Sequence, residues 1–122
     1  MSTIMVLEDN ADLGFMIRQI LEFRGHEVLY GYTGREGVVL LETANTLPDV
    51  IFCDLMMPDM DGHEFIAYMK QQSAWAAIPF IIMSANGAPE DRDYAASIGA
   101  SGFLAKPFGL QDLDALLAQR HM

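Results

Sequence analysis

The sequence has few of the residues on which several classes of protein depend. It has a single cysteine, Cys53, in 122 residues, so no disulfide can form within the chain. No apolar run approaches the roughly 20 residues that a membrane-spanning helix needs. The first residues, Met1 to Thr3, carry no basic charge of the kind that begins a secretory signal. We therefore expect a cytoplasmic protein with no membrane contact, in which Cys53 is a buried structural thiol.

Positive charge is also scarce. Seven Lys and Arg residues stand against 17 Asp and Glu residues, and the formal net charge is −10 at pH 7. The basic residues are scattered and form no basic helix or patch. Because contacts to phosphates supply most of the affinity of nucleic-acid-binding proteins, we expect no direct nucleic-acid partner. Only two residues are lysines, and one of them, Lys106, stands between an apolar run and a proline, where a simple surface role is not expected.

Short apolar runs alternate with segments of helical periodicity along the whole chain. The length and the apolar fraction of 52% suit one folded domain, which we expect to span residues 1–122. Strands are predicted over residues 3–7, 27–30, 50–54, 80–83 and 102–105. A helix is predicted after each strand, with starts near residues 11, 34, 63, 89 and 110. This alternation predicts an α/β fold of the (βα)5 type, a doubly wound parallel five-stranded sheet with helices on both faces.

Four of the predicted strands end in polar side chains. Glu8 and Asp9 follow the first strand, Asp54 closes the third, Ser84 follows the fourth and Lys106 follows the fifth. In a parallel sheet the carboxyl ends of the strands lie at one edge, where ligands of such folds bind. Three carboxylates, a hydroxyl and an ammonium group are therefore predicted to meet in one pocket.

The three carboxylates suit a divalent metal ion. Unpaired, they would repel one another, and one of them would have to take up a proton. Mg²⁺ binds carboxylate oxygens, backbone carbonyls and water, so Asp9 and Asp54 are candidate direct ligands and the carbonyl of Met56 is a third. Glu8 is one carbon longer and is expected to act through water. The alternative for Glu8 and Asp9 is that they merely begin a helix, where acidic residues are favoured.

The remaining residues suit chemistry at a phosphoryl group. A carboxylate beside Mg²⁺, here Asp54, can act as a nucleophile toward phosphorus. Lys106 would neutralise one phosphoryl oxygen, and Ser84 would donate a hydrogen bond to another. Each has a simpler alternative: Asp54 as a turn residue, Ser84 as a strand-end serine and Lys106 as a lysine that reaches for solvent. Pro107 argues against the last, because a Lys–Pro bond in a tight turn can be cis and direct the lysine.

Over its whole length the chain resembles the response-regulator receiver domains of two-component signalling, in particular single-domain members like the chemotaxis regulators. The matching segments are Glu8-Asp9, Asp54 in Asp-Leu-Met-Met-Pro-Asp-Met-Asp-Gly, Ser84-Ala85 and Lys106-Pro107-Phe108. The combination is specific, although no single segment is. The resemblance implies a flavodoxin-like sheet with the strand order 2-1-3-4-5.

The resemblance also implies a function and the residues that perform it. Asp54 would accept a phosphoryl group from a histidine kinase or a histidine phosphotransfer protein. Mg²⁺, or Mn²⁺, would be held by Glu8, Asp9, Asp54 and the backbone carbonyl of Met56. The protein would be a regulatory switch that promotes only its own phosphorylation and dephosphorylation, and not an enzyme.

The resemblance further implies how the signal is passed on. Ser84 and Lys106 would bind the phosphoryl group, and movement of the Ser84 hydroxyl toward Asp54 would let the switch residue Phe103 turn inward. The face formed by the fourth helix, the fifth strand and the fifth helix would then change for a downstream protein target or an output domain. A monomer or a weak phosphorylation-dependent dimer is expected. For Phe103, ordinary strand packing remains the alternative.

Two neighbours of the predicted pocket bear on the lifetime of the phosphorylated form. Met56 and Asn86 would flank the path of a water molecule that attacks the acyl phosphate. A bulky apolar Met56 should fail to orient that water. Slow dephosphorylation in the absence of a partner is therefore predicted.

Three other functions fit parts of the pattern. A Mg²⁺-dependent phosphatase with an aspartyl nucleophile normally has a second Asp two residues later as general acid, and that position is Met56. An interaction module that is never phosphorylated would bury three like charges for no purpose, which is costly. A flavodoxin-like nucleotide binder needs a Gly-rich phosphate loop after the first strand, where Glu8-Asp9-Asn10 stands.

Overall fold

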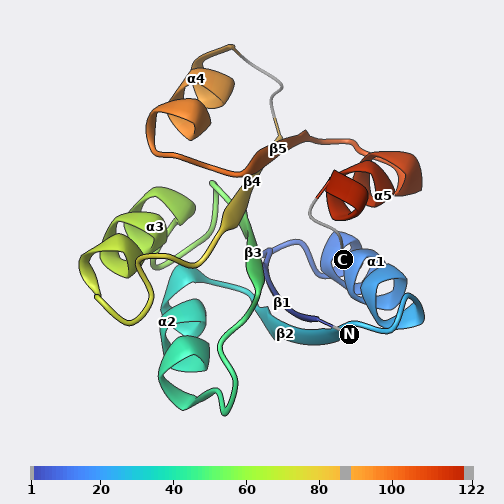
Figure 1. Ribbon diagram of the computed structural model, residues 1–122. Helices are drawn as coiled ribbons and strands as arrows, with labels where there is room; N and C mark the ends of the chain where they lie inside the picture. Colours follow the sequence, from blue (N-terminus) through green and yellow to red (C-terminus); the bar gives the residue numbers. More distant parts are fainter. Residues whose placement is uncertain (1, 86–88, 120–122) are drawn as a thin grey trace.

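The five predicted strands form one parallel sheet. In the computed structural model, which describes residues 2–85 and 89–119, the strand order is β2-β1-β3-β4-β5 (Figure 1). The strands are β1 Thr3–Leu7, β2 Glu27–Gly31, β3 Val50–Asp54, β4 Phe80–Ser84 and β5 Gly102–Ala105. The predicted (βα)5 fold and the strand order implied by the resemblance are confirmed, and β2 and β4 each extend one residue further than predicted.

The helices of the described residues cover both faces of the sheet. They are α1 Ala11–Phe23, α2 Gly34–Thr43, α3 Gly62–Gln71, α4 Pro89–Ser97 and α5 Leu110–Gln119. Helices α1 and α5 pack on one face, and α2, α3 and α4 pack on the other (Figure 1). Within the described ranges, the helices are too short or too polar to cross a membrane.

Side-chain caps determine where several helices begin. Asn10 before α1 and Thr33 before α2 each accept a hydrogen bond from the backbone amide three residues later. Asp61 and Glu64 form a reciprocal capping box at the start of α3. These caps satisfy amides that lack a partner in the first helical turn. Each of these helices therefore starts close to the edge where the preceding strand ends.

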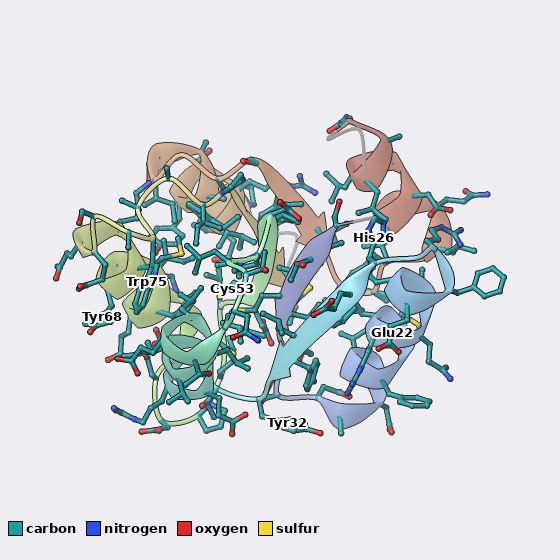
Figure 2. The ribbon with its side chains drawn as sticks, turned by 60° about the horizontal axis from the view of Figure 1, so that its bottom comes forward. Glu22, His26, Tyr32, Cys53, Tyr68 and Trp75 are labelled. Carbon is teal, nitrogen blue, oxygen red and sulfur yellow. The ribbon has the colours of Figure 1, made fainter. Side chains whose placement is uncertain are left out.

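The central strands are buried on both sides. Every residue of β3 and β4 is buried, and their side chains alternate between two apolar clusters on opposite faces of the sheet. Cys53, within β3 (Figure 2), belongs to the cluster shared with α2, α3 and α4. Burial raises the pKa of its thiol, so Cys53 stays protonated and inert. The prediction of a buried structural thiol is confirmed.

Helix α4 is weakly anchored on the sheet. It buries one residue, Ala95, whereas α3 buries four. Because burial of an apolar face holds a helix in place, a helix with little buried surface moves at low cost. Helix α4 is therefore the element that a change at the sheet edge can shift most easily.

Candidate functional site

The carboxyl ends of β1, β3 and β5 bring three charged side chains together. Leu7 pairs with Cys53 in the register of β1 and β3, so the next residues, Glu8 and Asp54, lie level at the sheet edge. The register of β4 with β5 places Lys106 just beyond the end of β5. The three side chains approach one another from separate strands, so the sheet itself sets their spacing.

Two carboxylates at this edge are buried and share one lysine. Glu8 is fully buried, and Asp54 is 2% exposed. Lys106 Nζ lies 2.6 Å from Glu8 Oε1 and 3.0 Å from Asp54 Oδ2. The Lys106–Pro107 peptide bond is cis, the form that a Lys–Pro bond in a tight turn can adopt. Lys106 therefore forms an ion pair with both buried carboxylates at once.

Asp9 completes an acidic cluster with these residues. One carboxylate oxygen from each of Glu8, Asp9 and Asp54 lies within 4.8 Å of the others, and Asp9 is exposed to solvent. Lys106 can balance only one of the three negative charges. Among the described residues, Glu8 Oε1 has no recorded polar partner other than the Lys106 ammonium group. Oxygen donors with uncompensated negative charge are what a hard divalent cation requires, so this donor set fits Mg²⁺.

The surroundings change the proton affinities of Glu8 and Lys106. Burial is the main cause that raises the pKa of Glu8 to about 7, against the lowering effects of Lys106 and of the Asn10 amide. That amide donates a hydrogen bond to Glu8 Oε2 at 3.0 Å. Burial alone would lower the pKa of Lys106, but its contacts with Glu8 and Asp54 outweigh burial and hold that pKa above its usual value. Lys106 is thus charged at neutral pH, where Glu8 is partly protonated without a metal ion.

The metal-free protein should lose stability as the pH rises from about 5 to 7. Glu8 has a pKa of about 7 in the folded protein and an ordinary value of 4.5 when unfolded, so the folded state holds more protons in this window. Raising the pH then favours the unfolded state, because ionising Glu8 in the folded protein is costly. Urea unfolding in EDTA across this pH range measures the effect. Glu8→Gln should remove it, and an unchanged pH dependence in Glu8→Gln would contradict the assignment to Glu8.

The two predicted switch residues both contact α4. The buried hydroxyl of Ser84 donates a hydrogen bond to the carboxylate of Asp91. Phe103 on β5 is half-buried, and the guanidinium carbon of Arg92 lies 4.6 Å from the centre of its ring. The sequence did not reveal that Asp91 and Arg92 contact these residues. An acidic residue such as Asp91 is common in the first turn of any helix.

Met56 lies beside Asp54 in the loop after β3. Its amide donates a hydrogen bond of 3.3 Å to Asp54 Oδ1, and its side chain is 72% exposed. An apolar side chain therefore stands in solvent next to the candidate nucleophile. Asn86, which was predicted to flank the same path, lies outside the described residues.

Comparison with known sequences agrees with this geometry. A family model described as the response regulator receiver domain matches residues 4–118. The KDP operon transcriptional regulatory protein KdpE of Escherichia coli is 38% identical over 117 residues, which are 96% of this chain and 50% of that protein. The response regulator SaeR of Staphylococcus aureus is 30% identical over 113 residues, 93% of this chain and 47% of that protein. The chain thus spans about half the length of these curated relatives.

Solved structures with the same fold lead to the same family. The chemotaxis protein CheY4 of Vibrio cholerae is similar with a TM-score of 0.87 and 29% identity, over 98% of each chain. The non-phosphorylated HemR receiver domain of Leptospira biflexa has a TM-score of 0.86 and 25% identity, over 98% of this chain and 93% of that chain. With its acidic cluster, this regulatory fold is that of a phosphorylation-dependent signalling switch. The chain belongs to the response regulator receiver domain family of two-component signalling.

Proposed function

We propose that Asp54 accepts a phosphoryl group from the phosphohistidine of a histidine kinase or of a histidine phosphotransfer protein. An oxygen of the Asp54 carboxylate attacks phosphorus, the N–P bond breaks, and the imidazole nitrogen keeps the bonding electron pair. The position of Asp54 carries the proposal: a buried carboxylate at the end of β3, 3.0 Å from Lys106 Nζ. Lys106 would bind a phosphoryl oxygen and offset the charge that develops on it during transfer.

The acidic residues around Asp54 would hold a metal ion. Asp9 and Asp54 would supply carboxylate oxygens, Met56 would supply its backbone carbonyl, and Glu8 would act through water. When bound, Mg²⁺ or Mn²⁺ would supply positive charge to the phosphoryl oxygens. Without it, three carboxylates would repel the incoming anionic group, because Lys106 offsets only one of their charges.

Ser84 and Phe103 would pass the change on to α4. If the Ser84 hydroxyl turns to the phosphoryl group, its hydrogen bond to Asp91 is lost. The space that Ser84 leaves would let Phe103 turn inward, away from Arg92. Helix α4, which buries only Ala95, would then lose two of its contacts with the sheet. The face of α4, β5 and α5 would change for a downstream protein or an output domain.

To test the proposal, the protein is incubated with Mg²⁺ and acetyl phosphate, and the mass of the intact protein is then measured. We expect one phosphoryl group to accumulate, and none when EDTA replaces Mg²⁺. Rapid consumption of acetyl phosphate without accumulation would indicate a phosphatase instead. No adduct, together with no spectral change on addition of beryllofluoride, would indicate an interaction module that is not phosphorylated.

Met56→Asn should shorten the lifetime of the phosphorylated form by roughly tenfold. An amide at this exposed position can orient a water molecule toward the acyl phosphate, which the thioether of Met56 cannot. Decay is followed by intact mass after acetyl phosphate has been removed by gel filtration. Met16→Asn, at a partly exposed position on α1, is the control and should decay like wild type. Equal lifetimes for Met56→Asn and wild type would show that Met56 does not limit the reaction.

A further inference from the structure

The carbonyl of Glu8 lies where β1 leaves the sheet. The amide of Glu8 still donates to the carbonyl of Gly31 on β2, at 3.1 Å. Strand β2 ends at Gly31, where the chain turns toward α2. The backbone hydrogen bonds between β1 and β2 therefore do not extend to the Glu8 carbonyl. A backbone carbonyl away from water needs a hydrogen-bond donor, and here the donor must come from a side chain or a loop.

The hydroxyl of Tyr30 supplies that donor. Its oxygen lies 2.5 Å from the carbonyl oxygen of Glu8. Tyr30 pairs with Val6 in the sheet, and its side chain packs in the cluster between the sheet and α1. Tyr30 therefore reaches from β2 to the turn formed by Glu8 and Asp9, the acidic turn, as a hydrogen-bond donor.

Gly14 on α1 leaves room for this phenol. A β-carbon at Gly14 would lie 1.9 Å from the Tyr30 hydroxyl oxygen, closer than atoms without a bond can approach. Glycine inside a helix costs about 1 kcal/mol relative to alanine. The close approach of Tyr30 explains why a residue that weakens the helix stands at this position.

We propose that Tyr30 is a positioning residue of the metal site. Its hydrogen bond fixes the carbonyl of Glu8, and so the plane of the Glu8–Asp9 peptide and the direction in which Asp9 offers its carboxylate. This inference rests on the proposed function, in which Glu8 and Asp9 hold the metal ion.

The acidic turn is also held from its other side. The Asn10 amide donates to Glu8 Oε2 at 3.0 Å, and the Asn10 side chain accepts from the Leu13 amide at 3.0 Å and caps α1. With Tyr30 acting from β2 and Asn10 from α1, the ligands are ordered before a cation binds. Groups that order metal ligands in this way raise metal affinity without touching the ion.

Tyr30→Phe tests this role because it removes the hydroxyl and keeps the ring. The matched control is Tyr32→Phe, at an exposed tyrosine just beyond β2 (Figure 2). The ring of Tyr32 meets that of Tyr30 edge-on, with 4.9 Å between the ring centroids. Calorimetric titration with MgCl₂ should give a dissociation constant about tenfold higher for Tyr30→Phe and unchanged for Tyr32→Phe. Gly14→Ala should also raise the constant, although alanine favours the helix, because its β-carbon displaces the phenol.

The magnesium dependence of phosphorylation separates positioning from a general structural role. Tyr30→Phe should react more slowly than wild type with acetyl phosphate at low Mg²⁺, and at the wild-type rate when Mg²⁺ is saturating. An unchanged dissociation constant would overturn the inference, and so would a lower rate that saturating Mg²⁺ does not restore. Either result differs from a failure of the proposed function, in which wild type itself would bind no Mg²⁺ or gain no phosphoryl group.

Discussion

Asp54→Asn is expected to abolish phosphorylation by acetyl phosphate. The side-chain amide has almost the same shape as the carboxylate, and its oxygen can still accept the hydrogen bond from the Met56 amide. It carries no charge and is a poor nucleophile toward phosphorus, so no acyl phosphate forms. Intact mass after incubation with Mg²⁺ and acetyl phosphate should therefore show no adduct.

Asp59→Asn is the matched control for this result. Asp59 lies in the same loop, and its φ of 68° is one that asparagine tolerates. Its carboxylate pairs with Arg35 at 2.8 Å, and both side chains are largely exposed, so the ion pair adds little stability. This variant should gain one phosphoryl group, like wild type. An adduct of wild-type yield on Asp54→Asn would refute Asp54 as the acceptor.

Lys106→Met should reduce both stability and phosphorylation. The Lys106 side chain is 17% exposed and faces the buried carboxylates of Glu8 and Asp54, whose side chains are 0% and 4% exposed. Removing one partner of a buried ion pair costs about 3–5 kcal/mol, because the remaining charge is left uncompensated. We expect a loss of this size in the free energy of unfolding in EDTA. Adduct formation should slow by about a hundredfold, because a phosphoryl oxygen loses its cationic partner.

Mg²⁺ and a second substitution separate the two effects of Lys106→Met. Mg²⁺ should restore part of the stability, because it supplies positive charge between the carboxylates, but it should not restore the rate. Adding Glu8→Gln should recover stability in EDTA, because it removes one of the two buried charges. A wild-type free energy of unfolding for Lys106→Met in EDTA would contradict the stabilising role of Lys106. A wild-type rate of phosphorylation would contradict its role toward the phosphoryl group.

Much of the fold could be predicted from local features of the sequence. Uniformly apolar runs such as 50–53 and 80–83 form central strands because both of their faces are covered. The helices capped by Asn10 and Thr33 begin at Ala11 and Gly34, where helix starts were predicted, and Gly25 follows α1 with a φ of 87° that suits glycine. The order of the strands came instead from the family resemblance, because periodicity does not say which strands are neighbours.

The site could be predicted only in part. Glu8, Asp54 and Lys106 could be placed at one edge, because parallel strands end there and each residue directly follows or closes an apolar run. The contacts of Tyr30 with Glu8 and of Asp91 with Ser84 could not be predicted. The first joins the Tyr30 hydroxyl on β2 to the backbone carbonyl of Glu8, and the second joins the side chain of Ser84 to that of Asp91 on α4, so each depends on how separate elements pack. A tyrosine in a strand or an aspartate in a first helical turn is too common to signal such a contact.

The position of the phosphoryl group is the most direct test of the proposed chemistry. Protein phosphorylated with acetyl phosphate and Mg²⁺ can be treated with borohydride, which reduces aspartyl phosphate to homoserine, and then digested and sequenced by mass spectrometry. We expect homoserine at position 54 and unmodified aspartate at Asp9 and Asp59. Homoserine at another aspartate, with Asp54 unmodified in fully phosphorylated protein, would contradict the assignment of Asp54 as the phosphoacceptor.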